Sequence, residues 1–122
     1  HGLSYTSFAY EGLSCAAQSD GSVRVTFSVE NRGSHPGAEV AQVYVAPPAG
    51  DLPRPVRELK EFARVELAAG ERKTVEIRLS REAFALFDPR PGAGWRVPPG
   101  TYGIDVGASS RDLRLRDAIE IK

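Results

Sequence analysis

Several features that would point to particular functions are scarce or absent in this sequence. It holds one cysteine, Cys15, which excludes an internal disulfide bond and leaves the core to be held by packing. Its 16 basic and 16 acidic residues leave no net charge, which argues against nucleic acid or an anionic membrane as a partner. No apolar run approaches the roughly 18 residues of a membrane-spanning helix. The only asparagine, Asn31, lies outside a glycosylation motif, and nothing in the sequence assigns a compartment.

The composition is that of one folded domain. Hydrophobic residues make up 41% and charged residues 26% of the 122 positions, which is typical of globular proteins and not of disordered chains. This length supports one core but not two. The first six residues, HGLSYT, look like the middle of a longer motif. We therefore expect residues 1–122 to be a single domain that is a fragment of a larger protein.

Alternating apolar and polar residues predict a series of short β-strands. The clearest alternation is at 22–30, where every second residue is valine or phenylalanine. Weaker patterns predict further strands at 8–13, 39–46, 74–80, 101–107 and 113–121. In 39–46 the second face is apolar too, through Val40 and Tyr44. That pattern is typical of a strand covered by the core on one side and by a neighbouring domain on the other.

Three segments need separate treatment. Residues 58–67 fit helical spacing as well as a strand pattern, and we favour a bulged strand because the surrounding elements are β. Residues 81–87 are expected to form a short helical turn. Residues 47–57 contain four prolines, which cannot donate to a sheet, so this segment is predicted to cross the surface. Six or seven strands without intervening helices predict an all-β, two-sheet antiparallel β-sandwich of immunoglobulin-like type.

Seven stretches share one resemblance. They read HGLSYT at 1–6, VTFSVENRG at 25–33, GAEVAQVYV at 37–45, RPVRELKEF at 54–62, LAAGE at 67–71, PGTY at 99–102 and VGASSRDLRL at 106–115. In this order and spacing they resemble the fibronectin type III-like domain of family-3 glycoside hydrolases, the β-glucosidases, β-xylosidases and their relatives. One departure is Glu61, where that family usually has glycine, and it bears on the expected bulge.

The resemblance implies a fibronectin type III-like fold and a place after the catalytic domains of such an enzyme. It also implies that the nucleophilic aspartate and the acid/base glutamate lie in those upstream domains. No catalytic residue is therefore carried over to this chain. The upstream catalytic domains are the expected partner, and a homo-oligomer contact is a further one.

The chain's own residues mark out no catalytic or metal site. A glycosidase needs two carboxylates facing one pocket, about 5–9.5 Å apart. Asp88 and Asp112 are the most distinctive acidic residues, and both are better explained as turn residues. His35 is expected in an exposed loop, and the two histidines lack a cluster at metal-ligand spacing. We expect no cofactor, and Cys15 is interpreted as a small buried side chain.

Five residues are candidates for contacts with a neighbouring domain or a pocket rim. Tyr5 lies near Phe8 and Tyr10 at the start of the chain, where these aromatic residues could dock on a preceding domain. The proline-rich segment carries Asp51, Arg54 and Arg57, and its alternative interpretation is a plain strand connection. Trp95 is interpreted mainly as a cover for one end of the core, with a sugar-stacking platform as the alternative.

Two functions of different classes follow. The first is a non-catalytic accessory domain that packs on and stabilises the catalytic domains of a β-glucosidase-like hydrolase. The second is an independent carbohydrate- or protein-binding module that uses a loop end or Trp95.

Overall fold

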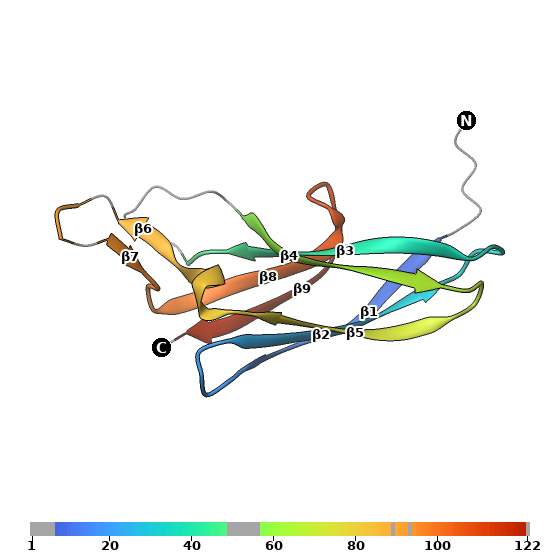
Figure 1. The fold of residues 1–122 in the computed structure, drawn as a ribbon, viewed down its shortest axis with the longest axis horizontal. Coiled ribbons are helices and arrows are strands. Elements are labelled where there is room, and N and C mark those ends of the chain that lie inside the picture. Colours follow the sequence, from blue (N-terminus) through green and yellow to red (C-terminus); the bar gives the residue numbers. More distant parts are fainter. Residues whose placement is uncertain (1–6, 49–56, 89, 93, 122) are drawn as a thin grey trace.

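The computed structural model describes residues 7–48, 57–88, 90–92 and 94–121 (Figure 1). The elements in these ranges are, in chain order, β1 Phe8–Ala17, β2 Val23–Asn31, β3 Gly37–Ala46, β4 Glu58–Leu67, β5 Arg72–Leu79, a 3₁₀ turn Arg81–Phe84, β6 Leu86–Asp88, β7 Gly94–Arg96, β8 Gly100–Ser109 and β9 Asp112–Ile121. None of these described elements is a helix long and apolar enough to cross a bilayer.

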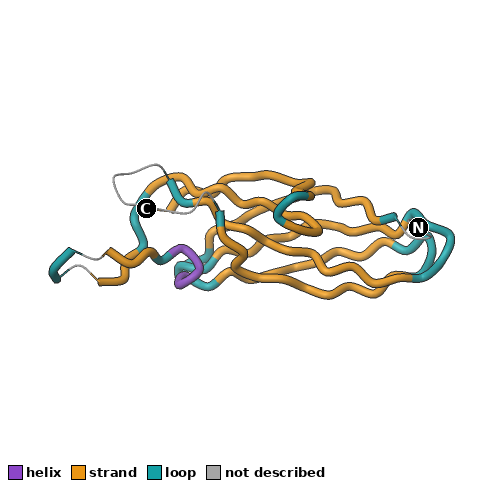
Figure 2. The backbone as a smooth tube through the Cα atoms, turned by 90° about the horizontal axis from the view of Figure 1, so that it is seen from above, coloured by secondary structure: helices purple, strands orange, loops and turns teal. Residues whose placement is uncertain are grey.

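Two antiparallel sheets and a separate hairpin make up the fold. One sheet has the strand order β1-β2-β5 and the other β4-β3-β8-β9. They stack as an elongated sandwich, and the β6–β7 hairpin projects beyond one end of it (Figures 1 and 2, left). The predicted all-β, two-sheet antiparallel sandwich is confirmed.

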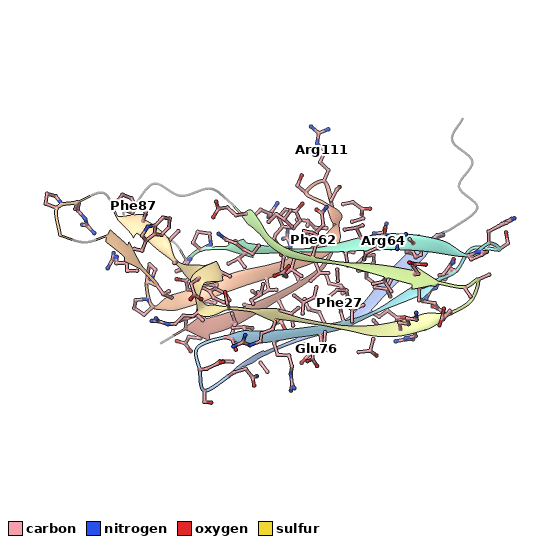
Figure 3. All side chains as sticks on the ribbon, viewed as in Figure 1. Phe27, Phe62, Arg64, Glu76, Phe87 and Arg111 are labelled. Atoms are coloured by element: carbon pink, nitrogen blue, oxygen red, sulfur yellow. The ribbon has the colours of Figure 1, made fainter. Side chains whose placement is uncertain are left out.

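The core lies between the facing sides of the two sheets. In β2, β5 and β8 the apolar residues of each alternating pattern are buried, and their polar neighbours point outward. Figure 3 shows Phe27 between the sheets, where it is 1% exposed and stacks on Tyr10 at a ring-centroid distance of 6.1 Å. Burial of each such side chain contributes about 1.5–3 kcal/mol. Packing of these inner faces therefore does the work that a disulfide would do in a smaller domain.

The ambiguous segment at 58–67 is a bulged strand, as predicted. β4 pairs with β3, and the register shifts where Val43 faces Glu61 but Tyr44 faces Leu59, so that Lys60 is the extra residue. No residue other than glycine has a positive φ in the described ranges. Glu61 therefore occupies its place without the backbone conformation that would demand glycine.

The segment after β5 differs from its prediction. Only Arg81–Phe84 is helical, and the chain then forms β6, which pairs with β7 in a hairpin that the sequence patterns did not indicate. Strands of three residues are too short to show an alternation. Neither strand of this hairpin therefore has an apolar pattern of its own from which it could be predicted.

Asn31 is a buried polar centre at the end of β2. Its side chain is fully buried and makes three hydrogen bonds. The amide Nδ2 donates to the carbonyls of His35 (2.9 Å) and Leu67 (3.2 Å), and Oδ1 accepts from the N–H of Gly33 (2.8 Å). This one residue ties the β2–β3 loop to the end of β4.

Candidate interaction surface

The outer face of the four-stranded sheet carries large apolar side chains in contact with solvent. Val40 is 40%, Leu59 47% and Phe62 60% exposed. Pairing places Leu59, Tyr44, Asp105 and Arg116 in one row across the four strands. The next row contains Phe62, Gln42 and Gly107. We call the exposed group Val40, Leu59 and Phe62 the apolar strip.

A charged cluster lies at the end of the first row. Asp105 is only 6% exposed although it points to the outer face. Its carboxylate is contacted by Arg57 Nε at 3.1 Å and by Arg116 Nε at 3.4 Å. The Arg57 Nε is buried and its contact lacks hydrogen-bond geometry, so it is an ion pair only. Two guanidinium groups thus share one carboxylate.

An open hollow of about 480 Å³ adjoins this cluster. It is lined by the three charged residues of the cluster, by a fourth charged residue, Asp117, and by the small residues Ala46, Gly103 and Ala118. Ala46, Gly103 and Ala118 form one row across β3, β8 and β9. The floor of the hollow is therefore low, and a side chain from another molecule can approach the sheet backbone there.

The outer face of the three-stranded sheet has the opposite character. Its cross-strand pairs include Arg24 with Arg78, Thr26 with Glu76, and Ser28 with Thr74. On β1 the residues of this face are Ala9, Glu11, Ser14 and Ala16. Figure 3 shows Glu76 on this side, opposite the sheet that bears Phe62. This face is a polar surface of the kind that water covers well.

The β6–β7 hairpin carries an exposed aromatic pair. Trp95 is 72% and Phe87 54% exposed, and their rings meet edge to face at a centroid distance of 5.4 Å. The preferred interpretation of Trp95 as a cover for the core is wrong. The hairpin holds the indole outside the sandwich, and Phe84 and Tyr102 fill that end of the core instead, with ring centroids 5.2 Å apart.

The other candidate contact residues have mixed outcomes. Arg57 lies in the charged cluster, whereas Tyr5, Asp51 and Arg54 lie outside the described residues. Tyr10, expected to dock with Tyr5, is a core residue whose hydroxyl donates to Glu39 Oε2 at 3.0 Å. Burial raises its pKa.

Two further residues with shifted pKa values, Cys15 and Asp112, have structural roles. Cys15 is half-buried against the core, and desolvation raises the pKa of its thiol to about 12. The Asp112 carboxylate accepts hydrogen bonds from Arg114 Nε (3.0 Å) and Nη2 (2.8 Å), which lower its pKa, as suits a residue at a turn. His35 is exposed in the β2–β3 loop, as predicted. Within the described ranges, no group of three His, Cys, Asp or Glu side chains could hold a metal ion.

The sequence did not predict two groups of residues, the charged cluster on the four-stranded sheet and the aromatic pair on the hairpin. Asp105 and Arg116 are 11 positions apart, and nothing in their local patterns predicts that the β8–β9 register makes them neighbours. Phe87 was assigned to a helical turn. A usable signal did exist for the apolar strip: the second apolar face of β3 predicted that this side of the sheet is covered.

Comparison with known proteins agrees with this architecture. Residues 39–110 match the fibronectin type III-like domain family. An exo-α-(1→6)-L-arabinopyranosidase of Bifidobacterium longum is 42% identical over 93% of this chain, and a probable β-glucosidase K of Emericella nidulans is 41% identical over all of it. The chain spans only 15% and 14% of the lengths of these two relatives.

Solved structures give the same result. A GH3 β-glucosidase of Bifidobacterium adolescentis superposes with a TM-score of 0.91 over 99% of this chain, at 37% identity, and the chain spans 18% of it. DesR, a β-glucosidase of Streptomyces venezuelae, superposes with a TM-score of 0.90 over 100% of this chain, at 34% identity. This chain therefore belongs to the fibronectin type III-like domain family, in the form carried as a small part of larger β-glucosidases of glycoside hydrolase family 3.

Proposed function

We propose that this chain is a non-catalytic accessory domain of a family-3 glycoside hydrolase, which packs on the catalytic part of the same polypeptide and stabilises it. The observation that carries the proposal is the share of its relatives that the chain spans. In the arabinopyranosidase and the glucosidases compared above, about five-sixths of the polypeptide lies outside this domain.

The state of the acidic residues supports a non-catalytic role. A glycosidase acid must hold its proton near neutral pH, which requires a raised pKa. Asp20 and Glu76 line one hollow, but Asp20 is exposed and its pKa is lowered by hydrogen bonds from Ser22 and Arg78. In the hollow beside the charged cluster, Asp105 is held between two guanidinium groups. The lowered pKa of Asp20 makes it unsuited to act as the acid near neutral pH.

An activity assay tests this proposal. The isolated 122-residue chain and the longer native polypeptide that carries it are assayed side by side on aryl β-glucosides. We expect turnover by the longer polypeptide and none by the isolated chain. Turnover by the isolated chain that Asp20→Asn or Glu76→Gln removes would overturn the proposal.

A second candidate, an independent carbohydrate-binding module, is favoured by one observation. Trp95 presents an open aromatic face, and the hollow beside it, of about 180 Å³, is also lined by Arg81, Glu82 and Arg96. An aromatic face with adjacent charged groups is an arrangement that can hold a pyranose ring. Calorimetry with a panel of gluco-oligosaccharides tests it. Heat that Trp95→Ala abolishes would support this function, and no heat with any sugar would exclude it.

A further inference from the structure

We propose that three adjoining hollows at the hairpin end of the domain form one groove that binds a neutral oligosaccharide, with one sugar ring stacked on Trp95. The groove runs from the β6–β7 hairpin past the 3₁₀ turn and the β1–β2 loop to the outer face of the three-stranded sheet. This inference rests on the proposed function and deepens it, because the accessory domain then holds sugar chains for the longer polypeptide. Unlike the independent module considered above, the site belongs to the hydrolase and extends over several rings.

Shared residues show that the hollows adjoin. Arg81 lines both the hollow beside Trp95, of about 180 Å³, and a second hollow of about 350 Å³. The second hollow shares Gln18, Ser19 and Ser22 with a third, of about 250 Å³. The hairpin, the β1–β2 loop and the end of β9 lie at the same end of the sandwich (Figure 1). The three hollows therefore form a row that suits a ligand of several rings better than a ligand of one.

Trp95 gives the row an aromatic wall at one end. Its ring is 72% exposed and meets Phe87, its cross-strand partner, at a centroid distance of 5.4 Å. That contact restrains the indole, so little freedom is lost when a ligand stacks on it. The C–H groups on one face of a pyranose ring form an apolar surface that packs on an aromatic face, while the hydroxyl groups remain at the edge of the ring. Figure 3 shows Phe87 on the hairpin, far from Phe62.

Polar groups along the rest of the row are already held in place. Asp20 Oδ1 accepts hydrogen bonds from the backbone N–H (3.0 Å) and Oγ (2.6 Å) of Ser22, and Arg78 Nε donates to the same Oγ (3.2 Å). Gln18 Nε2 donates to the carbonyl of Ala16 at 3.0 Å. Each sugar hydroxyl can both donate and accept, so it can bond to guanidinium, carboxylate and amide groups alike. Fixed donors and acceptors beside one aromatic ring favour a polyhydroxyl ligand over an apolar protein surface.

Charge identifies the ligand as neutral. Among the described residues, those that line the three hollows include four arginines and four carboxylates: Arg24, Arg78, Arg81 and Arg96, and Asp20, Glu76, Glu82 and Glu120. Opposite charges in equal number leave no surplus to attract an anionic polymer or a nucleic acid. A neutral sugar chain needs no such surplus.

Thiol labelling in the longer native polypeptide tests the groove. Ser19→Cys places an exposed reporter thiol in two of the hollows, and Thr74→Cys is the control on the exposed strand β5, outside their linings. The probes are thio-linked β-gluco-oligosaccharides of two and four rings, in (1→3), (1→4) and (1→6) linkage, because glycosidases do not cleave the thio linkage. We expect about 10 mM of a tetrasaccharide, in at least one linkage, to slow labelling of Cys at 19 by iodoacetamide about fivefold, as for a Kd of about 2.5 mM. Labelling of Cys at 74 should not change.

The disaccharides test the length of the groove. A disaccharide stacked on Trp95 fills only the hairpin end, so we expect it to slow labelling at 19 less than about twofold at the same concentration. Equal slowing by two and four rings would overturn the assignment of a groove for several rings.

Matched variants test the aromatic end and the charge. Trp95→Ala should abolish the protection of Cys at 19 by the tetrasaccharide, whereas Phe62→Ala, which removes a similarly exposed ring from the other sheet, should leave it unchanged. Both rings are exposed, so neither replacement opens the core. Tetragalacturonate, an anionic sugar chain, should protect less than the neutral tetrasaccharide. Protection that survives Trp95→Ala, or stronger protection by tetragalacturonate, would overturn the inference.

The outcomes separate this inference from the function on which it rests. No slowing by any of the oligosaccharides would remove the groove and leave the accessory function standing. Slow labelling at 19 without any sugar would mean that the rest of the polypeptide covers the groove, which overturns the inference and supports packing of the domain. Sugar protection in a longer polypeptide that does not hydrolyse aryl β-glucosides would overturn the proposed function and leave the groove.

Discussion

Replacing Asn31 by alanine should be among the most damaging single changes outside the apolar core. The side chain is completely buried and makes three hydrogen bonds of 2.8–3.2 Å. Each such bond contributes about 1 kcal/mol net, and each buried group left without a partner costs about 1–3 kcal/mol. Water can reach the exposed loop at His35 and Gly33, whereas the Leu67 carbonyl loses its partner in a buried place. We expect a loss of about 3–5 kcal/mol.

That loss is large compared with the stability of the domain. At about 0.05–0.15 kcal/mol per residue, 122 residues give a free energy of unfolding of about 6–18 kcal/mol. Urea unfolding followed by far-UV circular dichroism measures the change. Fluorescence is a poor probe here, because the only tryptophan, Trp95, is 72% exposed in the folded state and changes little on unfolding.

Asn31→Asp is the matched variant, since it keeps the shape and replaces the amide donor by a carboxylate. That carboxylate would face the carbonyls of His35 and Leu67, so its pKa in the folded state should be raised. A raised pKa makes the variant most stable below the pKa of the unfolded state and less stable as the pH rises. A loss below about 1 kcal/mol for Asn31→Ala, or no pH dependence for Asn31→Asp, would refute the role assigned to this residue.

Three further predictions concern other parts of the domain. Gly107→Ala should cost about 2–3 kcal/mol in urea unfolding, because a Cβ there would lie 2.1 Å from the Asp112 carbonyl oxygen, while the control Gly103→Ala meets only Ala46 at 3.4 Å; equal costs would contradict the steric argument. Cys15, with a thiol pKa of about 12 against an ordinary 9.0, should be alkylated at pH 8 about a thousandfold more slowly in the folded chain than in urea, and similar rates would show that its burial is wrong. Asp20 has a pKa lowered from 3.8 by Ser22 and Arg78, so its interactions stabilise the domain above that pH and are lost in stronger acid; Asp20→Asn should reduce the fall in melting temperature between pH 5 and pH 2, and an unchanged fall would exclude this contribution.

The inner half of the sandwich could be read directly from the sequence. In β2, β5 and β8, apolar residues recur at every second position, and a strand can bury such a pattern on only one of its faces. The class of fold, the inward residues of these strands and the bulged strand at 58–67 were predicted for this reason. The second apolar face of β3 likewise indicated which sheet carries apolar residues on its outer side.

Tertiary structure alone decided the rest of the candidate surface. Arg57, Asp105 and Arg116 meet because β8 pairs with β9 in one particular register and Arg57, the residue before β4, lies beside them. No local pattern contains that information. The size and hydrophobicity of Trp95 favoured a place over the core, and only the paired β6–β7 hairpin shows that the ring lies outside it. A period of two residues reports which side of a strand is apolar. Which strands become neighbours, and what then faces outward, is settled by contacts between residues far apart in the chain.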